Sequence, residues 1–171
     1  MSIKQLTSKE YFKTMQNIYF ALIGAQVFFC ILSLFLHYVS KSDSGQQELR
    51  DIFIYIVPLI VFGGSFISYY VFRSMLSASK SMKALTDKMI GYRYALIIRY
   101  AFLEGPSFFA IIVYFLTGDW LFLTMSALII LLFLTIKPTP EKAVKDLQLD
   151  FNDHQSIYDP NKVIAFMESG K

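Results

Sequence analysis

Charged residues and cysteine are both scarce in this chain. Asp, Glu, Lys and Arg make up 17% of its 171 residues, below the roughly one quarter that is usual in soluble domains. A single cysteine, Cys30, excludes an intramolecular disulfide framework and a thiol cluster for metal. The two histidines, His37 and His154, fall on opposite sides of the membrane predicted below, so we expect no metal site and no cofactor.

Long apolar runs account for the low charge. Four segments come close to, or exceed, the ~20 residues that a helix needs to cross a hydrocarbon core of ~30 Å. They are residues 18–39, 52–72, 95–116 and 120–136. Only Thr117–Asp119 separates the last two, which predicts a tight antiparallel hairpin. We therefore predict an all-α polytopic membrane protein, with a four-transmembrane-helix bundle in residues 1–136 and a tail in residues 137–171.

The distribution of positive charge predicts the topology. Lysine and arginine are frequent before the first segment, between the second and third segments, and in the tail, whereas the opposite side carries only Lys41 and Arg50. By the positive-inside rule, both termini and the middle loop are cytoplasmic. This arrangement explains the net charge of +3 without nucleic acid as a partner. It predicts a multi-pass protein of the inner membrane, with the lipid bilayer as its surroundings.

Helix signals also occur outside the apolar runs. Thr7–Glu10 has the form of a capping box, which predicts a short interfacial helix near the N-terminus. The second segment is expected to continue as helix to about residue 89, with Gly91 as the break. The signal for this extension is an apolar seam made of Met75, Met82, Leu85 and Met89. The seam could pack against the protein's own tail, against lipid headgroups or against a partner helix.

The tail predicts one short helix. Thr139 is in position to cap it, Pro140 to occupy its first turn and Glu141 to complement its dipole, so we expect helix over about 140–149. Residues 150–160 are expected to form an irregular, acidic connection. Asp159 and Pro160 then predict a last helical turn or two through Met167.

Glu104 is the residue that most needs an explanation. It lies nine residues into the third segment, ~13 Å from the cytoplasmic edge of a helix that rises ~1.5 Å per residue. Counting to the same depth in the other segments reaches small or hydrogen-bonding residues: Gln26, Gly63, Gly64, Ser65 and Ser126. Such groups reduce the cost of a carboxyl in hydrocarbon. Together with Glu104 they are predicted to form a polar core or an ion-binding site.

Arg99, Tyr100 and Pro106 are the expected supporting residues. Pro106 has no amide hydrogen, so the carbonyl of Phe102 loses its partner within the helix. Arg99 lies five residues before Glu104, ~140° around a straight helix, and either snorkels to the headgroups or pairs with Glu104 across a bulge near Pro106. Glu104 itself either fixes helix packing or exchanges a proton or cation.

The stretch Ile97–Gly118, "IIRYAFLEGPSFFAIIVYFLTG", resembles the carboxylate-bearing helix of the proteolipid subunits of rotary F- and V-type ATPases. In that family a mid-helix glutamate or aspartate is followed by a small and aliphatic run that ends near a turn. The resemblance implies that Glu104 is an ion-binding carboxylate. The whole chain also resembles small four-helix membrane proteins of bacteria with an Arg-x-x-x-x-Glu-Gly third helix, a likeness that implies no particular activity.

Three functions stay open at this point. The first is a small subunit or accessory of a membrane assembly, with further copies or other membrane subunits as partners. The second is proton or cation translocation through Glu104 in a homo-oligomer. The third is a small multidrug-type exporter, a class that also uses a lone membrane glutamate. The sequence shows neither a nucleophile–base pair nor a set of metal ligands near the membrane edge, so we do not expect an enzyme.

Overall fold

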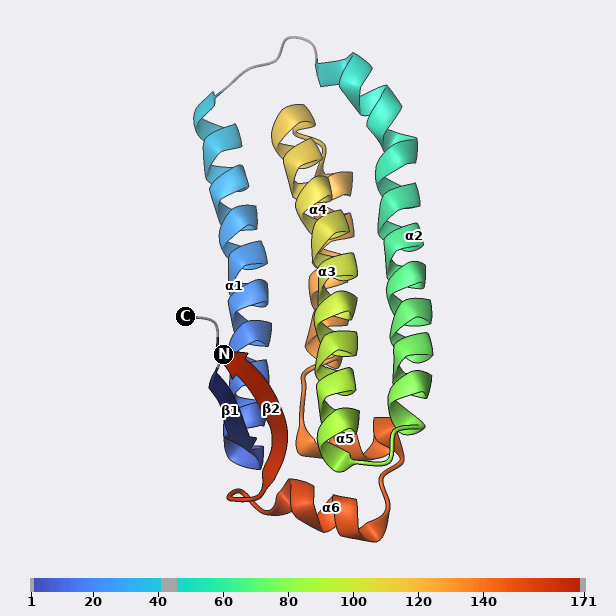
Figure 1. Ribbon diagram of the computed structural model, residues 1–171. Coiled ribbons are helices and arrows are strands. Elements are labelled where there is room, and N and C mark those ends of the chain that lie inside the picture. The colour runs from blue at the N-terminus through green and yellow to red at the C-terminus, as the bar shows by residue number, and fades with distance from the viewer. Residues whose placement is uncertain (1, 41–45, 170–171) are drawn as a thin grey trace. The chain divides into compact units, whose positions relative to one another are not determined.

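The computed structural model describes residues 2–40 and 46–169 (Figure 1). In these residues the elements are β1 (Ser2–Thr7), α1 (Ser8–Ser40), α2 (Gln46–Lys80), α3 (Leu85–Thr117), α4 (Trp120–Thr135), α5 (Pro140–Leu147), α6 (Phe151–Tyr158) and β2 (Val163–Ser169). The helical class predicted from the sequence is confirmed. Helices α1, α2 and α3 are long and apolar enough to cross a membrane, and α4 meets that criterion only together with α5, from which it is bent by 85°. The described chain thus has three candidate spans, or up to four.

Two compact units make up the chain. One, which we call the membrane unit, consists of Phe20–Tyr69 and Arg99–Ile136. The other, the terminal unit, consists of Met1–Tyr19, Tyr70–Ile98 and Lys137–Lys171. Helices α1, α2 and α3 each contribute one segment to each unit.

In the membrane unit, several polar side chains are buried together with part of the apolar ones, and many large apolar side chains are exposed. The buried polar residues are Gln26, Ser33, Ser68, Ser107, Thr117 and Ser126. Exposed apolar residues occur on each helix, among them Phe28, Phe35, Leu59, Phe62, Phe66, Ile112 and Leu131. A soluble domain would bury most of these side chains, whereas lipid tails cover them without cost. This distribution supports assigning the unit to a bilayer.

The turn between α3 and α4 is as tight as predicted. Gly118 has a φ of 69°, a conformation that favours glycine, and its amide donates to the carbonyl of Tyr114 at 2.7 Å. Asp119 then caps α4, because its side chain accepts a hydrogen bond from the Leu121 amide at 2.9 Å.

The terminal unit contains a two-stranded antiparallel sheet that the sequence did not predict. β1 pairs with β2, from Ser2 opposite Ser169 to Thr7 opposite Val163. The predicted last helical turns through Met167 are therefore wrong, because this segment is a strand. The irregular connection expected at 150–160 is wrong as well, since α6 occupies most of it and Asp150 caps α6 by accepting from the Asp153 amide at 2.9 Å.

Both predicted helix caps of this unit are confirmed. The Thr7 amide donates to Glu10 Oε2 at 3.1 Å and the Glu10 amide donates to Thr7 Oγ1 at 3.3 Å, which is a reciprocal capping box. The helix that follows is not a separate short one, however, because α1 runs without a break to Ser40. Thr139 caps α5 by accepting from the Lys142 amide at 3.3 Å, and α5 ends at Leu147.

The helix predicted to extend to about residue 89 is interrupted. α2 ends at Lys80 and α3 starts at Leu85, so the apolar seam is divided by a turn, with Met82 exposed and Met89 fully buried. Gly91 is not a break, because it lies inside α3. A Cβ there would overlap the Ser79 hydroxyl, so the glycine permits close approach of α2 and α3.

Polar contacts connect the tail to the helices of the terminal unit. The Ser8 hydroxyl donates to the carbonyl of Ile157 on α6. Lys88 on α3 forms an ion pair with Asp153 on α6 at 2.8 Å. The Tyr92 hydroxyl lies 3.2 Å from Asp146 Oδ2 on α5 and donates to it.

Candidate functional site

The contacts between α1 and α3 show which residue of α1 lies at the level of Glu104. The Ser33 hydroxyl donates to the carbonyl of Ile111 at 3.4 Å, across a separation of 78 residues. Two ring contacts have nearly the same difference in residue number. Phe29 contacts Phe108 with ring centroids 5.4 Å apart, a difference of 79, and His37 contacts Tyr114 at 5.6 Å, a difference of 77. The two helices therefore run parallel in a constant register throughout this part of the membrane unit.

This register places Gln26 opposite Glu104, since 104 − 26 = 78. On α3, Glu104 is four residues before Phe108 and seven before Ile111, which puts it on the side that meets α1. On α1, Gln26 is three residues before Phe29 and shares its face of the helix. The two polar side chains are one turn from the nearest aromatic contact.

Both polar groups lack a partner. Gln26 is 0% exposed, and neither its side-chain nitrogen nor its side-chain oxygen has a hydrogen bond. Glu104 is half-buried, and it forms no hydrogen bond or ion pair with another described residue. Buried amides of this kind are rare, because each unmade hydrogen bond costs about 1–3 kcal/mol.

A second polar contact lies one turn farther along α3. The hydroxyls of Ser107 and Ser126 share a hydrogen bond of 2.8 Å, and Cys30 Sγ lies 3.9 Å from Ser126 Oγ. Ser107 and Ser126 are fully buried. Ser126 was predicted at the depth of Glu104; in the structure it is paired with a residue three positions later on α3.

At the level of Glu104, α2 contributes close packing rather than a hydrogen-bond donor to the carboxyl. A Cβ at Gly64 would lie 2.6 Å from Pro106 Cγ and 3.2 Å from the carbonyl oxygen of Phe102, the carbonyl that Pro106 leaves without an intrahelical donor. Gly63 faces open space. Ser65, which the sequence suggested as a donor to Glu104, donates instead to the Val61 carbonyl of its own helix at 2.7 Å.

The supporting residues are also held by backbone contacts. The Ser68 hydroxyl donates to the backbone carbonyl of Arg99 at 3.0 Å. The Tyr100 hydroxyl donates to the carbonyl of Ile136 at 3.4 Å, and its ring stacks on Phe133 with centroids 5.5 Å apart. These contacts hold α3 against α2 and α4 on one side of Glu104. In the predicted topology this is the cytoplasmic side.

One feature of the membrane unit was missed from the sequence. Arg50, near the start of α2, forms an ion pair of 2.5 Å with Asp119 of the α3–α4 turn. The hydrogen bond from the Leu121 amide, followed by that from Arg50, holds the pKa of Asp119 below its usual value. A signal was available, because both charges flank apolar runs on the same predicted side of the membrane.

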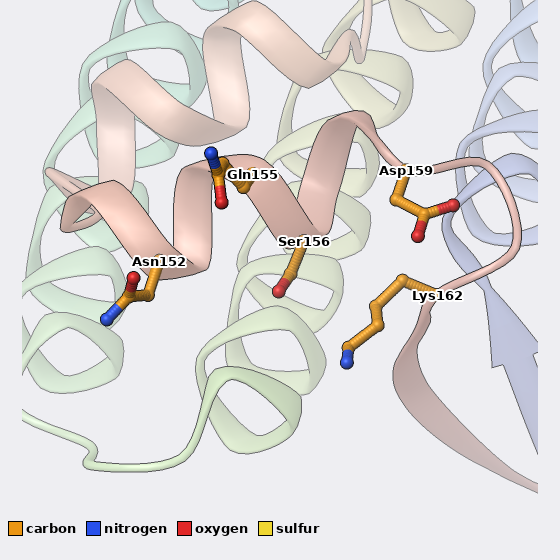
Figure 2. A pocket seen from close by; sticks show the side chains of 5 residues that line it. All are labelled: Asn152, Gln155, Ser156, Asp159 and Lys162. Carbon is orange, nitrogen blue, oxygen red and sulfur yellow. The ribbon is translucent and has the colours of Figure 1, made fainter.

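The terminal unit has a surface hollow of about 330 Å³ along α6. Figure 2 shows Asn152, Gln155 and Ser156 on the helix, with Asp159 and Lys162 just after it. All of these side chains except Ser156 are exposed, so solvent competes for each polar contact. The hollow is polar but holds no buried, unpaired group, and it is a weaker candidate than the pair in the membrane unit.

In the part of the chain that the structure describes, no three His, Cys, Asp or Glu side chains are grouped as metal ligands would be. Comparison of the chain with protein-family models, with curated proteins and with solved structures finds no match. The chemistry of Gln26 and Glu104 is therefore the basis on which the function is inferred.

Proposed function

We propose that this integral membrane protein is a small, non-enzymatic subunit or accessory of an assembly in the inner membrane, with both termini cytoplasmic. One observation carries the proposal: Glu104 is only half-buried within the membrane unit and has no partner there. A carboxyl facing lipid tails at this depth costs a few kcal/mol, and such residues usually face protein. A second copy or another membrane subunit would cover it.

The surface to be covered is one flank of α3. Ala101, Glu104, Phe108 and Phe115 lie within about a sixth of the turn around the helix, at ~100° per residue, and Ala101 and Phe115 are exposed. We call this surface the Glu104 flank. Its small and aromatic residues allow close packing of a neighbouring helix around the carboxyl.

Site-specific crosslinking tests this proposal. A photoreactive amino acid at Ala101 should form a discrete protein adduct in native membranes, either with a second copy or with another subunit. The matched control is Leu131 on α4, which is 59% exposed and should react with lipid alone. Lipid adducts alone from both positions would contradict the assembly role.

Proton or cation translocation through Glu104 is the second candidate. The observation in its favour is that polar side chains continue along the interior beyond Glu104, through Ser107 and Ser126 to Ser33 and then His37. The likeness of Ile97–Gly118 to proteolipid helices supports the same function. In proteoliposomes, Glu104→Gln should abolish proton or cation flux while assembly is preserved, and unchanged flux would exclude this role for Glu104. No observation in the described residues favours the exporter.

A further inference from the structure

The unpaired amide of Gln26 indicates what Glu104 binds. An amide side chain has a carbonyl oxygen that accepts and an NH₂ group that donates, and both are unused here. The group directly opposite in the register is a carboxyl, which is also unused. The helices place the two side chains at one level, so we expect side-chain rotation to bring them together.

We propose that protonated Glu104 pairs with Gln26 through two hydrogen bonds, and that the two residues form a proton-binding site between α1 and α3. A neutral carboxylic acid has one O–H donor and one carbonyl acceptor. The Glu104 O–H donates to Gln26 Oε1, and Gln26 Nε2–H donates to the Glu104 carbonyl oxygen. This planar acid–amide pair satisfies both atoms of Gln26 at once.

Only the protonated form matches Gln26 fully. A carboxylate accepts but cannot donate, so it leaves Gln26 Oε1 facing another acceptor with no hydrogen between them. In the reaction a hydronium ion transfers its proton to one Glu104 oxygen: one O–H bond of hydronium breaks to leave water, one O–H bond forms on the carboxyl, and the negative charge disappears. Proton binding therefore makes one hydrogen bond and removes a charge from the membrane interior, which both favour the paired state.

The neighbouring groups favour a proton over a metal ion. The nearest titratable or charged residues along these two helices are Tyr100 and Arg99, four and five residues earlier on α3, and Cys30, one turn along α1. The Tyr100 hydroxyl already donates to the carbonyl of Ile136. At this level α2 packs Gly64 against α3, and α4 has the buried Ile129; neither residue is titratable. Calcium needs six to eight oxygen ligands and magnesium needs six, whereas the site offers the three oxygens of two side chains.

Infrared spectroscopy in lipid nanodiscs tests the site. A carboxylic-acid C=O band that is present at neutral pH in the parent and disappears in Glu104→Gln reports protonated Glu104. Replacing Gln26 by Leu, or by Met of similar length, should shift this band to higher wavenumber because the carbonyl loses its hydrogen bond. The reciprocal exchange, Gln26→Glu with Glu104→Gln, should restore the band at its original position.

Chemical labelling of the carboxyl provides a second measurement for variants that assemble poorly. A hydrophobic carbodiimide, which modifies protonated carboxyls, should label Glu104 in the parent and residue 26 in the exchange variant, and should fail to label Glu104→Gln. Absence of the band and of labelling in the parent at neutral pH would overturn the proposal. So would an unshifted band in both Gln26→Leu and Gln26→Met. Neither result depends on the crosslinking partner, so the proton site and the assembly role are tested separately.

Discussion

The adjacent glycines of α2 allow a sharp test of how α2 and α3 approach each other at the level of Glu104. A Cβ at Gly64 would lie 2.6 Å from Pro106 Cγ, closer than van der Waals contact permits, and 3.2 Å from the Phe102 carbonyl oxygen. A Cβ at Gly63 would have no heavy atom within 4 Å. Overpacking costs about 1–3 kcal/mol, whereas an unhindered glycine-to-alanine change in a helix is favourable by up to ~1 kcal/mol. The propensity gain is common to both variants and cancels, so Gly64→Ala should be less stable than Gly63→Ala by the overpacking cost, about 1–3 kcal/mol.

Reversible unfolding of the two variants in mixed micelles of mild detergent and dodecyl sulfate measures this difference. The pair is matched, because each variant adds one methyl group to the same helix at neighbouring positions. Equal stabilities would mean that α2 and α3 are not in contact at Gly64. The packing against Pro106, and with it the place of α2 in the polar layer, would then be refuted.

Three further outcomes are expected. In a cysteine-free background, cysteines at Ser44, which lies outside the described residues, and at the exposed Gln155 should be labelled from opposite sides of the membrane; labelling from one side would exclude the predicted topology. Because hydrogen bonds hold the pKa of Asp119 low, its stabilisation is complete at neutral pH and is lost as the pH falls through its folded-state pKa. Asp119→Asn should reduce this acid-dependent loss of thermal stability, and an unchanged pH profile would contradict the assignment. A double-mutant cycle of Lys88→Ala and Asp153→Ala should give a coupling of about 0.2–1 kcal/mol, which would be absent if α6 did not rest on α3.

Signals that lie close together in the sequence predicted the fold well. Apolar runs identified the long helices, and the Thr7 and Thr139 caps identified where α1 and α5 begin. The pairing of β1 with β2 could not be predicted in this way, because each strand has its partner at the other end of the chain and a two-stranded sheet is only marginally stable alone. The turn at 81–84 was missed for a related reason: the apolar spacing continues across it, and spacing alone does not show that a helix has ended.

At the candidate site, the depth of each residue in the membrane could be predicted from the sequence, whereas the direction of its side chain could not. Depth follows from the constant rise of a helix, so Gln26 could be predicted at the level of Glu104 by counting. Direction depends on how each helix rotates against its neighbours, which is why Ser65 bonds within its own helix and Ser126 pairs with Ser107. The same rotation leaves Glu104 half-buried on the side of α3 that meets α1, at the level of Gln26. A carboxyl in that position can hold a proton on its inner side while its outer side meets a partner, so the binding site and the assembly surface would share one residue.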